Sequence, residues 1–346
     1  MSDDYKIVAY TPERKEEVLQ LASYVWSPDP ELCVSYLKWK YHDNPYMVAP
    51  VFYLAMHDGR AVAMRGLFTS RWESNGNFFE LPCFGDSAAL PEHRGRGLMG
   101  LITRSALDDI GSERPKYALS LSAGAFTRRA FVENGAVRLD LPVTYTRRME
   151  PADIASSYTL SENCLDSVSG SVQVAPSVWI EERPRPQAMG RLIMRIPRDG
   201  RIRHVRDAAY FSWRFGNPLS RYWFLYCATG DELSGYLVMQ MSRKKRELVN
   251  IIDYEALDRD VALQLLHSAV AVSGGSQLTI WPDTSERMHS GTIYDLGFAA
   301  FRDSRVHCML VGSTCRTQPQ AEWELGCRQL CDPRNWDMRM IYSDNY

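Results

Sequence analysis

Hydrophobic and polar positions alternate in short, well-bounded stretches over the first 75 residues of the chain. Apolar residues at helical spacing predict helices over residues 12–26 and 30–41, after a short strand at 5–10. Strands at 51–56 and 61–72 flank a tight-turn dipeptide, Asp58-Gly59. The chain therefore begins with a strand, two helices and an antiparallel hairpin, which is typical of an α+β fold.

The pattern changes at residue 84, where an apolar strand leads into a glycine-rich turn and then a helix. The apolar run 84–90 stops at Pro91, and helical spacing resumes at 98–111. The turn between them is Arg94-Gly95-Arg96-Gly97-Leu98-Met99-Gly100. A helix N-terminus behind glycines favours an anion, because its first amides and its dipole face that end. Arginines add donors suited to phosphate oxygens.

Two other glycine-rich phosphate motifs fit this stretch poorly. A nucleotide P-loop requires Gly-Lys-Ser/Thr, which does not occur here. The run 95–100 matches Gly-x-Gly-x-x-Gly by letter, but a dinucleotide-binding domain would have an acidic residue at the end of the next strand. The next expected strand, 117–122, ends without one. We therefore predict a pyrophosphate-binding turn; the structural alternative is an ordinary turn with solvated arginines.

The motif Arg94-Gly95-Arg96-Gly97-Leu98-Met99 resembles that of the GNAT superfamily of N-acetyltransferases, Arg/Gln-x-x-Gly-x-Gly/Ala. It departs from that pattern at Met99. A second signature of the superfamily, a helix that ends in glycine before a strand, is matched by Ala130-Phe131-Val132-Glu133-Asn134-Gly135-Ala136. The resemblance covers residues 5–149. It implies a mixed, mostly antiparallel sheet with flanking helices, an acyl-CoA co-substrate and no metal.

The second half of the chain repeats the pattern of the first over about 170 residues. The segment 210–218, Tyr-Phe-Ser-Trp-Arg-Phe-Gly-Asn-Pro, echoes 36–45, and strands and helices follow in the same order. We therefore expect a tandem GNAT fold. Its parts would be an acyl-CoA-binding domain at 1–150, a linker or excursion at 151–205, and a degenerate GNAT-like domain with a tail at 206–346. The second copy has Glu255-Ala256-Leu257-Asp258-Arg259-Asp260 in place of the glycine-rich turn, so it should not hold a pyrophosphate.

The resemblance also implies which residues contact the cofactor and which one acts as base. The cofactor residues would be Ser87, Ala88, Ala89 and Leu90 along the pantetheine, with Arg94, Gly95, Arg96, Gly97, Leu98, Met99 and Gly100 around the pyrophosphate. We expect Asp86 to be the general base, since strand alternation places it among apolar residues that would raise its pKa. The structural alternative is an ion pair with a nearby arginine, such as Arg65 or Arg71.

The general acid stays unassigned at this stage. The tyrosine that the superfamily uses to protonate the leaving thiolate corresponds here to Phe131, which has no proton to donate. Tyr145, another hydroxyl or water could replace it.

An aromatic segment before the first hairpin is the expected wall of the acceptor site. Aromatic rings with amide and hydroxyl groups suit sugar faces and nucleotide bases. For Trp39 the alternative is a role as a core anchor, because Trp213 repeats it. The expected contacts are Tyr36, Trp39, Tyr41, Asn44 and Tyr46.

The tandem layout and the tail resemble acyltransferases that modify amino sugars in surface-polysaccharide pathways. The expected acceptor is thus the amine of an amino sugar, free or nucleotide-linked, in a cleft between the two halves. The alternatives are a small amino-thiol or antibiotic-like amine, and a non-catalytic acyl-CoA-binding module.

Composition excludes several other classes of protein. The chain of 346 residues has a net charge of −2, which gives no field that would favour nucleic acid or a membrane surface. The first residues lack the pattern of a signal peptide, and no apolar run reaches membrane-spanning length. Eight cysteines and seven histidines show no metal-ligand spacing. A cytoplasmic protein without a metal is expected, and its oligomeric state is not predicted.

Overall fold

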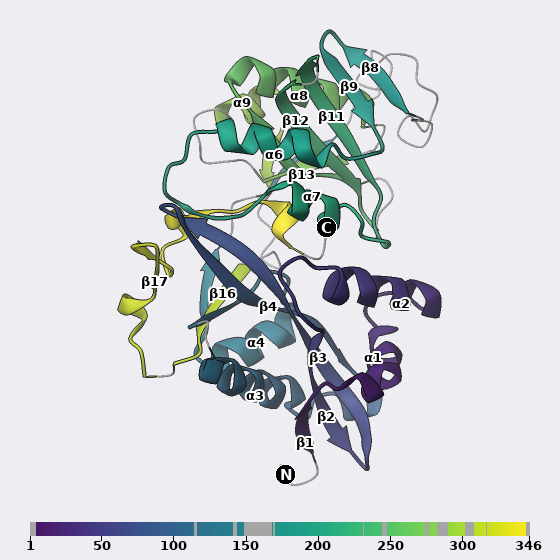
Figure 1. Cartoon of the computed structure of the whole chain (residues 1–346), viewed down its shortest axis with the longest axis vertical. Coiled ribbons are helices and arrows are strands. Elements are labelled where there is room, and N and C mark those ends of the chain that lie inside the picture. Colours follow the sequence, from purple (N-terminus) through teal and green to yellow (C-terminus); the bar gives the residue numbers. More distant parts are fainter. Residues whose placement is uncertain are drawn as a thin grey trace.

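The described part of the computed structural model contains two large β-sheets, one above the other along the long axis (Figure 1), and one two-stranded sheet. The structure describes residues 5–113, 116–140, 144–148, 168, 170–230, 232–243, 248–273, 277–281, 290–301, 308–315 and 317–343. Residues 151–167 and 169 of the expected linker lie outside the described residues.

The first sheet follows the order that the sequence predicted, with one strand supplied from far along the chain. Its main path is β1-β2-β3-β4-β5-β16-β6, antiparallel except for the β4–β5 pair. The strands are β1 (Lys6–Ala9), β2 (Val51–His57), β3 (Arg60–Ser74), β4 (Asn77–Ala89), β5 (Tyr117–Ser120), β6 (Val137–Asp140) and β16 (Cys308–Ser313).

Four α-helices flank this sheet. Helices α1 and α2 lie on one side of the strands, and α3 and α4 lie on the other (Figure 1). A π-helical turn at Lys38–His42 continues α2. The helices are α1 (Lys15–Ala22), α2 (Pro30–Leu37), α3 (Leu98–Glu113) and α4 (Ala125–Glu133).

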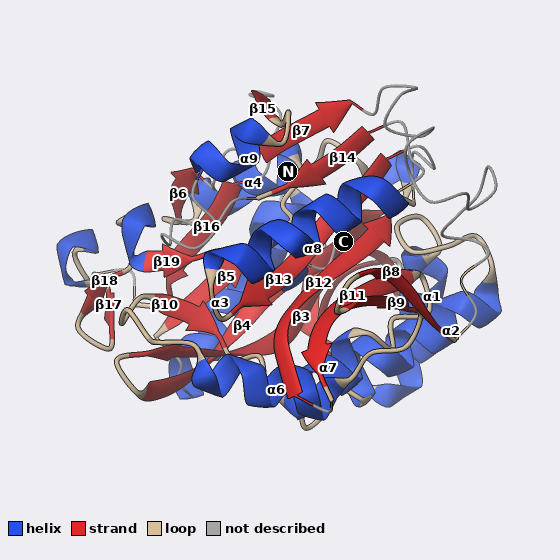
Figure 2. Cartoon of the chain, turned by 90° about the horizontal axis from the view of Figure 1, so that it is seen from above, coloured by secondary structure: helices blue, strands red, loops and turns tan. Residues whose placement is uncertain are grey.

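The second sheet repeats the pairing pattern of the first. Its order is β8-β9-β11-β12-β13-β14-β7-β15, and β13–β14 is again its parallel pair. Figure 2 shows α8 lying across these strands. The strands are β7 (Thr144–Arg148), β8 (Ser171–Ala175), β9 (Val178–Glu181), β11 (Tyr222–Thr229), β12 (Glu232–Met241), β13 (Leu248–Ala256), β14 (Gln277–Ile280) and β15 (Ala299–Phe301). The helices are α6 (Pro186–Arg195), α7 (Ala208–Arg214), α8 (Arg259–Val272) and α9 (Ser290–Asp295).

The two sheets exchange one strand. In the first sheet β16 lies between β5 and β6, and in the second sheet β7 takes the corresponding place between β14 and β15. Strand β7 lies within the expected first domain, 1–150, but it pairs in the second sheet. Moreover, β9 and α6 precede residue 206 and already belong to the second unit. The expected boundaries at 150 and 206 therefore do not separate the two sheets, because pairing crosses them.

A continuous apolar core joins the two units. The core of the first sheet includes Tyr210, Phe211 and Phe224 from the second. At its centre Trp39 and Trp213 stack with ring centroids 5.2 Å apart. Each indole N–H donates to the other residue's carbonyl oxygen, at 2.6 and 2.7 Å. Such a reciprocal contact between corresponding residues supports the internal repeat inferred from the sequence.

The C-terminal segment returns between the units. Strand β19 (Trp336–Asp337) pairs with β10 (Ile202–His204), which in turn pairs with β3. A small hairpin, β17 (Glu324–Leu325) and β18 (Arg328–Gln329), precedes it. This segment thereby contributes to the surface where the two units meet.

Candidate active site

The glycine-arginine turn, residues 94–100, leads into α3, as the sequence predicted. Its last three residues, 98–100, are the first residues of the helix. Gly95 and Gly97 have φ angles of +76° and +72°, a backbone conformation that other residues adopt at a cost. A Cβ on either glycine would meet no atom within 4 Å, so the turn is open on that side. Arg94 and Arg96 are exposed. The turn thus needs glycine for its shape and leaves room for a ligand.

The start of α3 adds backbone donors to this turn. The N–H groups of Gly100 and Leu101 already donate to the carbonyl of Gly97, at 2.9 and 3.3 Å. The amides before them have no acceptor within the helix, as in any first helical turn. Two arginines, first-turn amides and a helix dipole fit the pyrophosphate of an acyl-CoA.

Strand β4 parts from β5 just before this turn. The two strands pair in parallel at a single position, Cys83 with Leu119. Beyond it β4 remains bonded to β3: Ala88 pairs with Met64, and the Leu90 N–H donates to Val62. An unpaired strand edge presents N–H and C=O groups. The expected pantetheine residues, Ser87 to Leu90, lie on this part of the chain.

A β-bulge holds Asp86 in the middle of the site. Opposite Arg65 of β3, strand β4 has two residues, Asp86 and Ser87. Asp86 has a φ of +47°, which a residue other than glycine adopts only where its surroundings hold it. The bulge turns the carboxylate toward the side of α1 and α2.

Three donors contact the Asp86 carboxylate. Oδ1 accepts from Trp26 Nε1 at 2.8 Å, and Oδ2 accepts from Lys40 Nζ at 2.5 Å and from the Tyr41 hydroxyl. We call Trp26, Lys40, Tyr41 and Asp86 the Asp86 cluster. The expected apolar surroundings are therefore not observed. The ion-pair alternative is closer to the structure, but the partner is Lys40, because the π-helical turn brings it under the bulge.

Arg65, one of the two arginines considered as partners for Asp86, points to the opposite face of the sheet. Arg65 lies on the face of the sheet that α3 covers, and its Nη1 donates to Thr103 Oγ1. Its guanidinium stacks on Phe84, 4.2 Å from the ring centroid. Burial lowers the pKa of Arg65 to about 9. The bulge thus has a carboxylate on one face and a cation on the other.

Most of the expected acceptor residues have partners within the chain. Tyr36 and Tyr41 are buried, and the Asn44 side chain donates to Thr69 and accepts from the Tyr46 N–H, as in a structural turn. Trp39 stacks on its repeat partner and also lines a cavity. The Tyr46 hydroxyl is buried without a hydrogen-bond partner.

A small cavity of about 20 Å³ lies between the two units, next to the Asp86 cluster. That volume holds about one water molecule. Lys40 reaches it from the first unit, His204 from β10, which pairs with β3, and Tyr342 from the C-terminal segment. The Tyr342 hydroxyl is buried without a hydrogen-bond partner. The remaining lining residues are Trp39, Phe68, Tyr210, Trp213, Arg214, Ile341 and Ser343.

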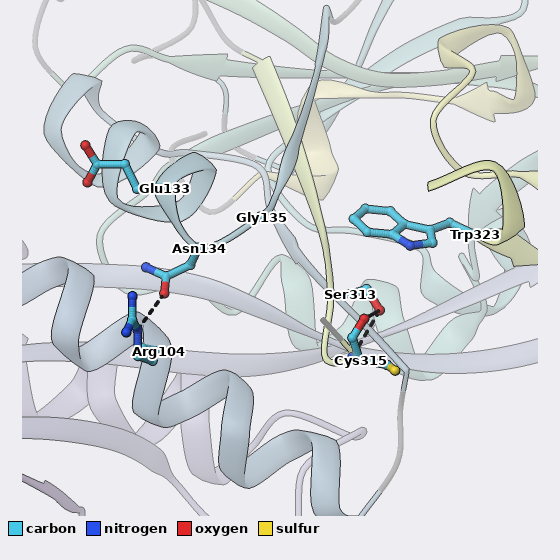
Figure 3. Close-up of a pocket in the computed structure, with 7 residues that line it drawn as sticks. All are labelled: Arg104, Glu133, Asn134, Gly135, Ser313, Cys315 and Trp323. Carbon is cyan, nitrogen blue, oxygen red and sulfur yellow. Dashed lines mark hydrogen bonds between the residues drawn. The ribbon is translucent and has the colours of Figure 1, made fainter. Parts of the chain in front are cut away.

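A larger pocket, of about 220 Å³, lies beside α3 and α4 (Figure 3). Arg104 and Asn134 point toward one another on one side, where Nε donates to Oδ1 at 3.3 Å. Trp323 faces them from the opposite side. Asn134 Nδ2 also donates to the carbonyl of Gly100, which links this pocket to the glycine-arginine turn. The other lining residues are Glu133, Gly135, Ser313 and Cys315.

The second unit occupies the corresponding helix N-terminus with its own carboxylate. Asp258 caps α8 by accepting from the Val261 N–H at 2.9 Å. Glu255 on the preceding strand pairs with Arg206 and Arg339 at 2.5 and 3.0 Å. A negative group already sits where a phosphate would bind. These contacts support the prediction that the second copy holds no pyrophosphate.

Comparison with known proteins places this site in a known class. Residues 6–129 match the family model of the acetyltransferase (GNAT) domain. The match spans β1 to the first part of α4, including the glycine-arginine turn and Asp86. This part of the chain is therefore similar to acetyltransferase domains of the GNAT type. Among curated proteins, no sequence matches the chain.

Solved structures with the same fold extend the likeness over both sheets. They include GCN5-related N-acetyltransferases of Anabaena variabilis (14% identity, TM-score 0.58) and Kribbella flavida (12%, 0.55). Another is an Enterococcus faecalis protein described as a probable N-acyltransferase (12%, 0.60). Each comparison covers 90% of this chain and 72–73% of the other. The expected α+β GNAT fold is thereby confirmed.

Two further searches of the structure concern membranes and metals. Among the described residues, no helix is long and apolar enough to cross a membrane. Within the same residues, no group of three or more His, Cys, Asp or Glu side chains could hold a metal ion.

Proposed function

We propose that the chain transfers an acyl group from acyl-CoA to a primary amine. The observation that carries this proposal is the glycine-arginine turn at the start of α3, directly beside a strand edge that β5 leaves unpaired. A diphosphate bound at the turn would lay its pantetheine along Ser87 to Leu90. The thioester would then reach the bulge at Asp86.

The amine would attack from the side of α1 and α2, where the Asp86 cluster lies. Its nitrogen forms a bond to the thioester carbon, the C–S bond breaks, and the electron pair stays on sulfur. The attacking nitrogen must also lose a proton. Asp86 already accepts three hydrogen bonds, one of them from the Lys40 ammonium. We therefore propose that the proton passes to water and that Asp86 chiefly fixes Lys40 and Tyr41 in place.

We propose an amino sugar as the acceptor, bound where the two units meet. Aromatic rings and hydroxyl groups, among them the unpartnered Tyr342 hydroxyl, surround the cavity there. Such a lining suits a sugar ring. The cavity of about 20 Å³ would have to widen on binding. A small amino-thiol or an antibiotic-like amine is the alternative acceptor.

One experiment separates these acceptors. Purified protein is incubated with acetyl-CoA and a panel of amino sugars, nucleotide-linked amino sugars, aminoglycosides and amino-thiols, and products are identified by mass. An acetylated amino sugar supports the proposal. Acetylation confined to another class moves the acceptor to that class.

A non-catalytic acyl-CoA-binding module is the second candidate. Two observations favour it: Phe131 has no proton to donate, and the Asp86 carboxylate already accepts three hydrogen bonds, one of them from the Lys40 ammonium. Binding of acetyl-CoA without a product from any amine in the panel would support this reading. No binding of CoA at all would refute both candidates.

A further inference from the structure

Arg65 is a buried cation without an anionic partner. Its side chain is fully buried in β3, and its Nε and Nη2 atoms have no hydrogen-bond partner. Thr103 on α3 accepts its one hydrogen bond. Aromatic rings of Phe84 and Phe131 lie 4.2 and 5.5 Å from its Cζ.

The buried charge of Arg65 does not serve to stabilise the fold. A buried guanidinium without a carboxylate loses its hydration, and aromatic faces replace only part of that loss. An apolar side chain of similar length would fill the same space without that cost. Unsatisfied buried donors of this kind are candidates for a role in binding or catalysis.

The position of Arg65 matches the far end of the proposed cofactor site. The last part of β4 extends from Phe84, just past the pair with β5, to Ala89, which precedes the glycine-arginine turn. At about 3.4 Å per residue this span is about 17 Å, comparable with the reach of an extended pantetheine arm. Arg65 stacks on Phe84, at the end where the thioester would lie.

We propose that Arg65 stabilises the negative charge on the sulfur of CoA as the thiolate leaves. This inference rests on the proposed function. When the C–S bond breaks, its electron pair stays on sulfur, and the Nε and Nη2 donors face that charge. Arg65 keeps its protons, and the released thiolate is later protonated by water. An electrostatic contact thus does the work of the missing proton donor at Phe131.

The test measures the ionisation of the bound thiol, which needs no acceptor. The ultraviolet absorbance of CoA thiolate is followed against pH with wild-type protein, Arg65→Met and the matched control Arg71→Met. A cysteine thiol ionises near pH about 8.5, and free CoA titrated in the same way gives the reference for the bound thiol. We expect bound CoA to ionise at lower pH with wild type and with Arg71→Met, but not with Arg65→Met. Desulfo-CoA gives the background, and Arg65→Gln replaces Arg65→Met if that variant does not fold.

Acyl transfer gives a second readout where an acceptor is known. Arg65→Met should lower kcat by about 10²–10³-fold with little change in KM for acyl-CoA. Identical thiol ionisation in wild type and Arg65→Met would overturn the inference, while the proposed function would stand if CoA still binds. A loss of affinity confined to succinyl-CoA would also overturn it, and would assign Arg65 to an acyl carboxylate.

Discussion

Replacing Asp86 with asparagine should destabilise the protein strongly, because it leaves a buried ammonium without its counter-ion. Lys40 Nζ lies 2.5 Å from Asp86 Oδ2, and the two side chains are 1% and 7% exposed. Breaking a buried ion pair by removing one partner typically costs about 3–5 kcal/mol. An asparagine has one acceptor oxygen, so it can keep the Trp26 contact at one position or the Tyr41 contact at the other, but not both. The largest loss should still come from Lys40, whose charge is left unpaired.

A double-mutant cycle isolates that contribution. The unfolding free energies of wild type, Asp86→Asn, Lys40→Met and the double variant are measured in urea by tryptophan fluorescence. Lys40→Met removes the stranded charge, so the double variant should be more stable than Asp86→Asn alone. We expect a coupling energy of about 1–3 kcal/mol between the two positions.

The opposite result would make Asp86 a general base. That role predicts a stability loss below about 1 kcal/mol for Asp86→Asn and a fall in turnover of about 10²–10⁴-fold. The fall would shrink at high pH, where the amine is already deprotonated. This pair of results would refute the counter-ion reasoning.

Three further results are expected. Calorimetry should give one CoA site per chain, lost in Gly97→Glu through bulk and negative charge but kept in Gly230→Glu; two equal sites would refute the asymmetry of the units. Burial lowers the pKa of His204 to about 3, below its unfolded value of about 6.5, so the unfolded chain binds the extra proton between these values. The unfolding free energy should then be level above pH about 6.5 and fall below it, by up to about 1.4 kcal/mol per pH unit, and His204→Phe should remove this part of the slope. In the folded protein a thiol reagent should label exposed Cys315, whose pKa is lowered by a hydrogen bond to a neighbouring hydroxyl, before buried Cys83; peptide masses after brief labelling would show the reverse order if this is mistaken.

Several elements of the first unit could be predicted from the sequence, because they depend on neighbouring residues alone. Asp58-Gly59 forms the predicted turn, Asn75-Gly76 forms a second turn of the same kind, and all four residues have positive φ. The helix α4 ends at Asn134-Gly135, with Gly135 at φ +91°. The glycine-arginine turn could be placed because it needs only neighbouring residues.

The contacts within the Asp86 cluster could not be predicted from the sequence in the same way. Lys40 is 46 residues from Asp86, and it reaches the carboxylate only because a π-helical turn follows α2. Strand alternation predicts which face Asp86 occupies, but a bulge with positive φ changes that face. Long-range partners and backbone irregularities therefore hid the charge pairing.

The exchange of β7 and β16 has a consequence for synthesis of the chain on the ribosome. The first sheet cannot close between β5 and β6 until β16 emerges, about 170 residues after β6. At a translation rate of roughly 5–20 residues per second, the facing edges of β5 and β6 stay without β16 for roughly 10–35 s. Strand β7 is available earlier and has the pairing pattern to occupy that place for a time. In the nascent chain β5 and β6 can therefore pair with either β7 or β16. The order of translation favours β7, which the finished protein does not use in this sheet.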